Sequence, residues 1–180
     1  SGSSGGVNIG AVNGVTLDVD GGSGGDKVTL DTAAIAYDVD MGAGDDTVTL
    51  TAVLANTAAI AGGAGTDTMA VFSAAAATIG GFTSTDVETI SVSSTAAAAA
   101  TIVSLNMGSV SGETGLQVTG SSSSVTFTNT DNIVPLTLSY NSAGNVVVTY
   151  NTTTVAGTAD AMTVNTTDTT SGVVNIAGVE

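Results

Sequence analysis

Apolar and polar residues alternate along much of this 180-residue chain, in short runs separated by turn residues. Alternation of this kind puts apolar side chains on one face of an extended segment, as in a half-buried β-strand. Two Ala-rich stretches, 74–77 and 96–100, have good helix propensity but are short, so we expect connections or single turns there. The pattern predicts an all-β fold with no long helix. In the second half, the alternating runs lie at 116–119, 125–128, 136–140, 146–150, 162–165 and 173–176.

The first half of the chain carries a repeat of about twenty residues. Residues 18–30 align with residues 38–50, and residues 60–71 follow as a third copy. Each copy has an extended run, a Gly-x-Gly-x-Asp turn and an alternating strand that leaves the turn. Two short strands with their turns fill such a repeat, at about 3.3 Å per strand residue. A unit this small cannot bury its apolar face alone, so we predict one coil of a parallel β-roll or β-solenoid per repeat.

The repeat pattern changes from about Phe72 onwards. Residues 95–180 are rich in Ser, Thr and Val, which fits further β-solenoid or β-sandwich strands equally well. We therefore expect three segments. Residues 1–6 are a linker or expression scar, residues 7–94 a repeat-containing solenoid, and residues 95–180 a β region truncated at its C-terminus.

The charge of the chain excludes several classes of function. It has 16 acidic residues, one basic residue (Lys27) and no His, for a net charge of −15. One basic residue cannot neutralise phosphates, which excludes nucleic acid as a partner and argues against anionic lipid. No run of about 18 apolar residues predicts membrane insertion. Without His or Cys, and with paired acids only in the repeats, we expect no enzyme activity.

The acidic residues point to a cation. Nine of the sixteen lie between Asp18 and Asp67, and clustered carboxylates without basic partners repel one another unless cations hold them. Calcium takes six to eight oxygen ligands, and a Gly-x-Gly-x-Asp turn offers both carbonyls and a carboxylate. One loop supplies about three ligands, so a full site needs two loops. We expect one ion between loops 21–26 and 41–46, and a second between 41–46 and 62–67.

The alternative for these loops is an ordinary β-turn in which Gly and Asp supply positive φ angles. Such turns require neither three copies in register nor clustered acids. Outside the repeats we expect no metal ligands. Asp86 and Glu88 are predicted to lie on a solvated strand edge, and Asp131, Asp160 and Asp168 to form turns.

The loops resemble the nonapeptide of the RTX (repeats-in-toxin) proteins, Gly-Gly-x-Gly-x-Asp-x-apolar-x. Gly21–Thr29 and Gly62–Ala70 match at every fixed position, and Met41–Thr49 matches with Met in place of the first Gly. The nonapeptide occurs once per coil rather than twice. With the Ala-, Thr- and Ser-rich remainder, this is similar to calcium-binding, type I-secreted surface-layer (S-layer) proteins of Gram-negative bacteria such as Caulobacter.

The resemblance implies a set of calcium ligands. Asp26, Asp46 and Asp67 would be the side-chain ligands, and Asp18, Asp20, Asp38, Asp40 and Asp45 are secondary candidates. The carbonyls that would lie nearby belong to Gly22, Gly24, Gly42, Gly44, Gly63 and Gly65.

These observations lead to a functional hypothesis. We expect a structural calcium-binding module at the bacterial cell surface, secreted and then folding and self-assembling into a homo-oligomeric lattice in extracellular calcium, with cell-surface polysaccharide as a further partner. The alternative is a calcium-dependent stalk or secretion module of an RTX adhesin or exoenzyme whose active part is absent. A third hypothesis takes Thr-rich strands such as Thr47–Thr49 as a flat ice- or sugar-binding face.

Overall fold

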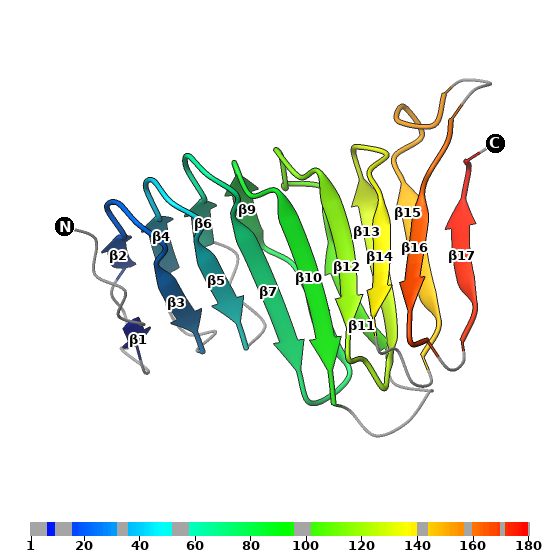
Figure 1. The fold of residues 1–180 in the computed structure, drawn as a ribbon, viewed down its shortest axis with the longest axis horizontal. Coiled ribbons are helices and arrows are strands. Elements are labelled where there is room, and N and C mark those ends of the chain that lie inside the picture. Colours follow the sequence, from blue (N-terminus) through cyan, green and yellow to red (C-terminus); the bar gives the residue numbers. More distant parts are fainter. Residues whose placement is uncertain are drawn as a thin grey trace. The chain divides into compact units, whose positions relative to one another are not determined.

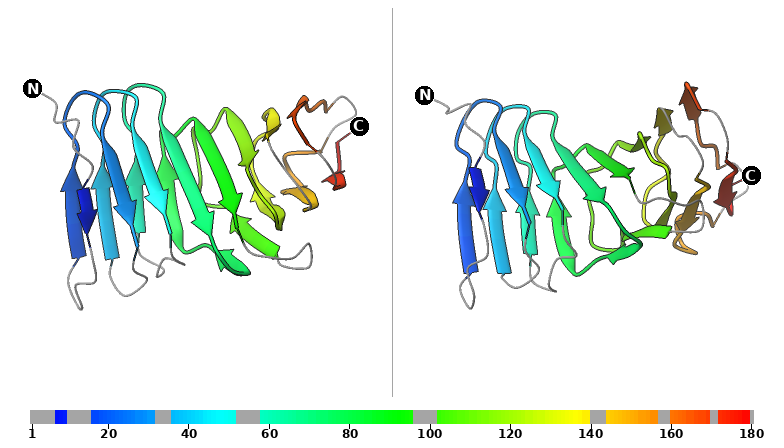
Figure 2. Two further views of the ribbon diagram at one scale, coloured as in Figure 1. Left: turned by 60° about the horizontal axis from the view of Figure 1, so that its bottom comes forward. Right: turned by 90° about the horizontal axis from the view of Figure 1, so that it is seen from below.

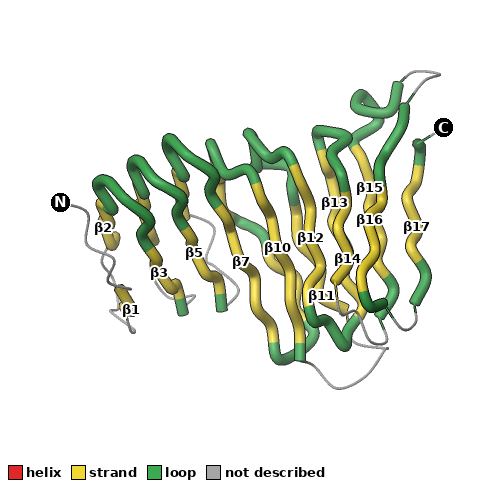
Figure 3. The backbone as a smooth tube through the Cα atoms, in the orientation of Figure 1, coloured by secondary structure: helices red, strands yellow, loops and turns green. Residues whose placement is uncertain are grey.

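The computed structural model confirms an all-β fold of the solenoid type (Figure 1). No helix occurs in the described ranges, and strands and loops alternate throughout them (Figure 3). None of these residues therefore forms a helix long and apolar enough to cross a membrane. The structure describes residues 7–9, 16–31, 36–51, 58–95, 102–139, 144–156, 160–169 and 172–179.

The chain divides into two compact units, of which the first comprises residues 1–72, 80–90 and 109–113. Its strands pair in the orders β1-β3-β5-β7 and β2-β4-β6-β9, so the chain alternates between two sheets on opposite sides of each coil (Figure 2). The strands are β1 (Val7–Ile9), β2 (Thr16–Asp20), β3 (Lys27–Leu30), β4 (Ala36–Asp40), β5 (Thr47–Leu50), β6 (Ala58–Ala61), β7 (Thr68–Ser73, to Phe72 in this unit) and β9 (Phe82–Thr85).

The second unit comprises residues 73–79, 91–108 and 114–180. Its strands pair in the orders β8-β11-β13-β15-β17 and β12-β14-β16, and every pairing described within it is parallel. This unit is therefore solenoid and not sandwich. Its strands are β8 (Ala77–Ile79), β11 (Ile102–Asn106), β12 (Gly115–Thr119), β13 (Ser124–Thr130), β14 (Leu136–Ser139), β15 (Val146–Tyr150), β16 (Val164–Thr167) and β17 (Val174–Ala177), with β10 (Thr89–Ser94) entering it at Ser91.

The core of each unit is a set of stacked apolar columns. In the first unit Val28, Val48 and Met69 occupy equivalent positions of β3, β5 and β7, and all three are buried. In the second unit Phe127 of β13 pairs with Val148 of β15, and both are buried. Parallel strands in register place equivalent positions side by side, so one buried position per coil generates a continuous column.

The predicted strands agree with the observed ones to within two residues. Four runs fall in β12, β13, β14 and β15, whereas the run at 162–165 overlaps β16 and that at 173–176 overlaps β17. Residues 74–76 form a bend that leads into β8, which begins at Ala77. The predicted linker at 1–6 and the Ala run at 96–100 lie outside the described residues. The expected division between residues 94 and 95 stays a prediction.

Candidate metal centre

The three Gly-x-Gly-x-Asp loops stack directly on one another along one edge of the first unit. They join β2 to β3, β4 to β5 and β6 to β7, and follow one another along the upper edge in Figure 1. Ser23, Ala43 and Ala64 form parallel bridges from loop to loop. The Gly24 N–H donates to the Ala43 carbonyl at 2.5 Å, and the Gly44 N–H to the Ala64 carbonyl at 2.8 Å. The twenty-residue period therefore places equivalent loop atoms one coil apart.

Glycine is required in these loops by backbone conformation and by space. Both glycines of the middle loop have positive φ, 90° at Gly42 and 136° at Gly44, a region that L side chains rarely adopt. A Cβ on Gly44 would lie 2.5 Å from the Gly24 carbonyl carbon. The corresponding glycines of the other two loops also have positive φ. The loops can therefore stack as closely as neighbouring β-strands only because glycine occupies both positions of the Gly-x-Gly sequence.

The loop aspartates form a buried ladder, which we call the aspartate column: Asp26, Asp46 and Asp67. Only 7% of Asp26 is exposed, and 2% of each of the other two. The Asp26 N–H donates to Asp46 Oδ1 at 2.6 Å, and the Asp46 N–H donates to Asp67 Oδ1 at 2.8 Å. Oδ1 of Asp46 and Oδ1 of Asp67 thus each satisfy a buried backbone donor of the preceding coil.

The second carboxylate oxygen of each column member has no such partner. Oδ2 of Asp26, of Asp46 and of Asp67 is buried and accepts no hydrogen bond from the described residues. Lys27 bears the only basic side chain of the protein and is exposed, so no buried basic side chain neutralises the column. A buried carboxylate without a counter-charge is strongly destabilising. A cation held by these oxygens would supply the missing counter-charge.

The pKa of Asp67 is raised, as expected for a buried carboxyl group near other acids. Burial raises the pKa of Asp67 above its ordinary value of 3.8, and the neighbouring charges of Asp46, Glu88 and Asp45 raise it further. The hydrogen bond from the Asp46 N–H acts in the opposite direction and lowers this pKa. The net effect is that the fold disfavours the charged form of Asp67 unless a cation is present.

The donor set fits a hard cation such as calcium. The loops offer carboxylate and carbonyl oxygens, and their one sulfur, in Met41, is buried in the core. Among the described residues no three acids lie together as a metal cluster, so carbonyls must complete any site. The Gly22 carbonyl accepts the Ala43 N–H at 3.0 Å and the Gly42 carbonyl accepts the Ala64 N–H at 2.8 Å. A carbonyl oxygen has two lone pairs, so each retains a donor position for an ion.

The secondary candidates do not join the column. Asp18 pairs in register with Asp38, and Asp20 with Asp40, all exposed on the outer face of β2 and β4. Asp45 is exposed on the loop edge, where its Oδ1 accepts the Thr66 N–H at 2.9 Å.

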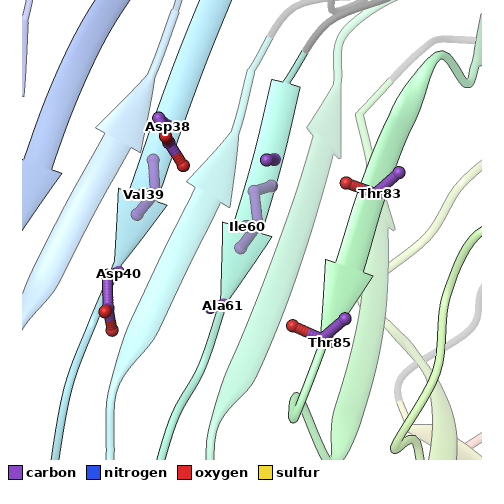
Figure 4. A pocket seen from close by; sticks show the side chains of 8 residues that line it. Asp38, Val39, Asp40, Ile60, Ala61, Thr83 and Thr85 are labelled. Carbon is purple, nitrogen blue, oxygen red and sulfur yellow. The ribbon is translucent and has the colours of Figure 1, made fainter.

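A shallow pocket lies on the outer face of the sheet that holds these surface aspartates. Its volume is about 300 Å³. Asp38 and Asp40 of β4 line one side, and Thr83 and Thr85 of β9 line the other (Figure 4). The floor is β6, where alanines pair with both flanking strands and leave the space between them open. Sequence patterns gave no sign of this pocket.

The column continues at a residue that the sequence analysis assigned wrongly. Glu88 is half-buried instead of solvated, and its Oε2 accepts the Asp67 N–H at 2.7 Å. It thus takes the place that Asp67 takes for Asp46. The available signal was spacing, because Glu88 follows Asp67 by 21 residues, as Asp67 follows Asp46.

Comparisons of the chain with protein-family models, with curated proteins and with solved structures find no match. What the protein does is therefore inferred from its own residues.

Proposed function

We propose that this protein is a structural, non-enzymatic module that binds calcium at its Gly-x-Gly-x-Asp loops and completes its folding outside the cell. The observation that carries the proposal is the aspartate column, in which three buried Oδ2 atoms have no hydrogen-bond partner. Calcium between successive loops would supply the missing charge, with Asp26, Asp46 and Asp67 as carboxylate ligands and the loop glycine carbonyls beside them.

Calcium-dependent folding follows from the spacing of the column. Carboxylates one coil apart, at the ~4.8 Å separation of neighbouring strands, repel by roughly 3 kcal/mol at an effective dielectric constant of ~20. An ion that binds only the folded chain stabilises it by about 4 kcal/mol when its concentration is ~1,000 times the dissociation constant. Scarce calcium would leave the loops loose inside the cell, and millimolar calcium would order them after secretion.

The location proposed is the surface of a bacterium, reached by type I secretion. There the module would self-assemble with copies of itself into a surface layer, with cell-surface polysaccharide as a second partner. A parallel solenoid supports this role, since its strands repeat at a regular spacing from coil to coil.

Circular dichroism tests the calcium proposal. Adding calcium to chelator-treated protein should increase β structure cooperatively, whereas magnesium at the same concentration should do so less, because it dehydrates reluctantly and demands octahedral geometry. The matched control is the triple variant Asp26→Asn, Asp46→Asn and Asp67→Asn, which should give the same spectrum with and without calcium. An unchanged wild-type spectrum in chelator would falsify the proposal.

Electron microscopy tests self-assembly separately. Ordered arrays that form with calcium and disperse in chelator are expected of a surface-layer module. Dispersed monomers in calcium would contradict the lattice and favour the stalk or secretion module instead.

A further inference from the structure

We propose a further hard-cation site at the end of the aspartate column, formed by the Asp67 carboxylate, the Asp86 backbone carbonyl and the Glu88 carboxylate. It rests on the proposed function, since calcium is the ion expected there. It differs from the loop sites because residues 80–88 contain no Gly-x-Gly-x-Asp sequence.

The unpartnered oxygen of Asp67 points towards Gly62, the first glycine of its own loop. Asp67 is 2% exposed, and its Oδ1 is already engaged by the Asp46 N–H. A Cβ built on Gly62 would lie 2.8 Å from Asp67 Oδ2, and it would overlap the Asp86 carbonyl oxygen. Glycine at position 62 thus allows the Asp67 carboxylate and the Asp86 carbonyl oxygen, from two successive coils, to approach the same point of the backbone.

The turn that carries Asp86 is held beside Gly62. The Gly62 N–H donates to the Thr85 carbonyl at 3.0 Å, which fixes the backbone immediately before Asp86. Asp86 has φ +53°, in the left-handed region, and its carbonyl faces Gly62. A backbone carbonyl and a carboxylate oxygen are the two donor types that calcium combines in protein sites.

Glu88 brings the second carboxylate. Its Oε2 accepts the Asp67 N–H at 2.7 Å, so this carboxyl group lies against the Asp67 backbone. Glu88 adds a negative charge beside that of Asp67, which this ion would share with the ion between loops 41–46 and 62–67. Glu88 is half-buried and Asp86 is exposed, so water can reach the site and complete the six to eight ligands of calcium.

Calcium titration by calorimetry on the full chain tests the site through the number of ions bound. The variant is Glu88→Gln, which keeps an acceptor for the Asp67 N–H and removes the charge. The control is Asp131→Asn, which neutralises an exposed acid of the second unit. Glu88→Gln should bind one ion fewer than wild type, Asp131→Asn should bind as many as wild type, and both should still gain β structure with calcium.

Equal ion numbers in Glu88→Gln and wild type would overturn this site and leave the proposed function intact. A wild-type chain that binds no calcium would overturn both. If Glu88→Gln does not fold in calcium, Glu88→Asp provides the second test. Its side chain keeps the negative charge but is one methylene shorter, so the carboxylate lies farther from the ion. That variant should bind its last ion about tenfold more weakly, since ligand placement sets calcium affinity; wild-type affinity would contradict the site.

Discussion

At the scale of single residues, Asp46 and Asp67 of the column each have two separate tasks. One oxygen accepts a backbone N–H of the preceding coil, as Asp67 Oδ1 does for Asp46. The other has no partner and carries the charge that a cation would neutralise. An asparagine could perform the first task but not the second. Substitution by asparagine therefore separates the hydrogen bond from the charge.

Asp67→Asn is expected to stabilise the calcium-free protein by about 1–3 kcal/mol, the range associated with a buried polar group that lacks a partner. The amide retains an acceptor for the Asp46 N–H, and it replaces Oδ2 with a donor on the side of the Asp86 carbonyl. Urea unfolding in chelator measures the change. The control is Asp45→Asn, since Asp45 is exposed. Equal stabilisation in both variants would contradict a specific role for burial.

The raised pKa of Asp67 also predicts how stability depends on pH without calcium. A carboxyl group whose pKa is higher in the folded than in the unfolded chain stabilises the fold below the ordinary value of 3.8. That stabilisation is lost as the pH rises through the raised pKa. The excess stability of Asp67→Asn over wild type should therefore grow as the pH rises above about 4 in chelator. A difference that does not change with pH would rule out this titration.

At the scale of elements, the loops depend on glycine more than the strands do. Gly44 has a φ of 136°, and a Cβ on it would overlap the Gly24 backbone. A Cβ on Gly115 in β12 would lie 3.9 Å from its nearest neighbour, the Pro135 carbonyl oxygen. The same substitution by alanine should therefore destabilise the protein at Gly44 and have little effect at Gly115.

Gly44→Ala should destabilise the protein by about 2–3 kcal/mol even in calcium, from left-handed strain together with the contact to Gly24. Gly115→Ala should change stability by less than about 0.5 kcal/mol. Thermal unfolding in calcium measures both. Similar melting temperatures for the two variants would mean that the stacked loops do not require glycine at this position.

Most of the strands and part of their pairing could be predicted from the sequence. Alternation located the strands, and the twenty-residue offset implied the parallel register of β3, β5 and β7. The position of Glu88 could not be predicted from motifs, because the 80–88 turn lacks the glycines that mark the loops. The pocket beside β6 depends on which strands become neighbours. Thr83 of β9 pairs with Ala59 of β6, although the two strands are not consecutive in the chain.

At the scale of the whole molecule, charge repulsion acts on every acid, and not only on those in the column. The net charge of −15 includes the exposed pairs Asp18–Asp38 and Asp20–Asp40. Salt screens exposed charges far better than buried ones. Screening by a monovalent salt and binding of calcium should therefore stabilise the protein by different amounts.

In chelator, about 1 M NaCl should stabilise the chain less than calcium does. At this salt concentration the Debye length is ~3 Å, so repulsion between surface acids is screened, but the buried column still has no counter-charge. A few millimolar calcium should stabilise it more at far lower ionic strength. Thermal melting under the two conditions makes the comparison, with magnesium as a second control. If NaCl alone restores the full melting temperature, screening accounts for the effect and no ion need bind in the loops.

The in-register stacking of the loops has a mechanical consequence. The middle loop hydrogen-bonds to the loop before it and to the loop after it, so load on these coils is shared only between adjacent ones. When such a unit is stretched, its coils should peel away singly, each releasing about twenty residues, or roughly 70 Å of extended chain. An ion bound between two loops would strengthen the contact between those two coils alone. Calcium would then set the force at which each coil yields, and the same residues that bind the ion would give the module its tensile strength.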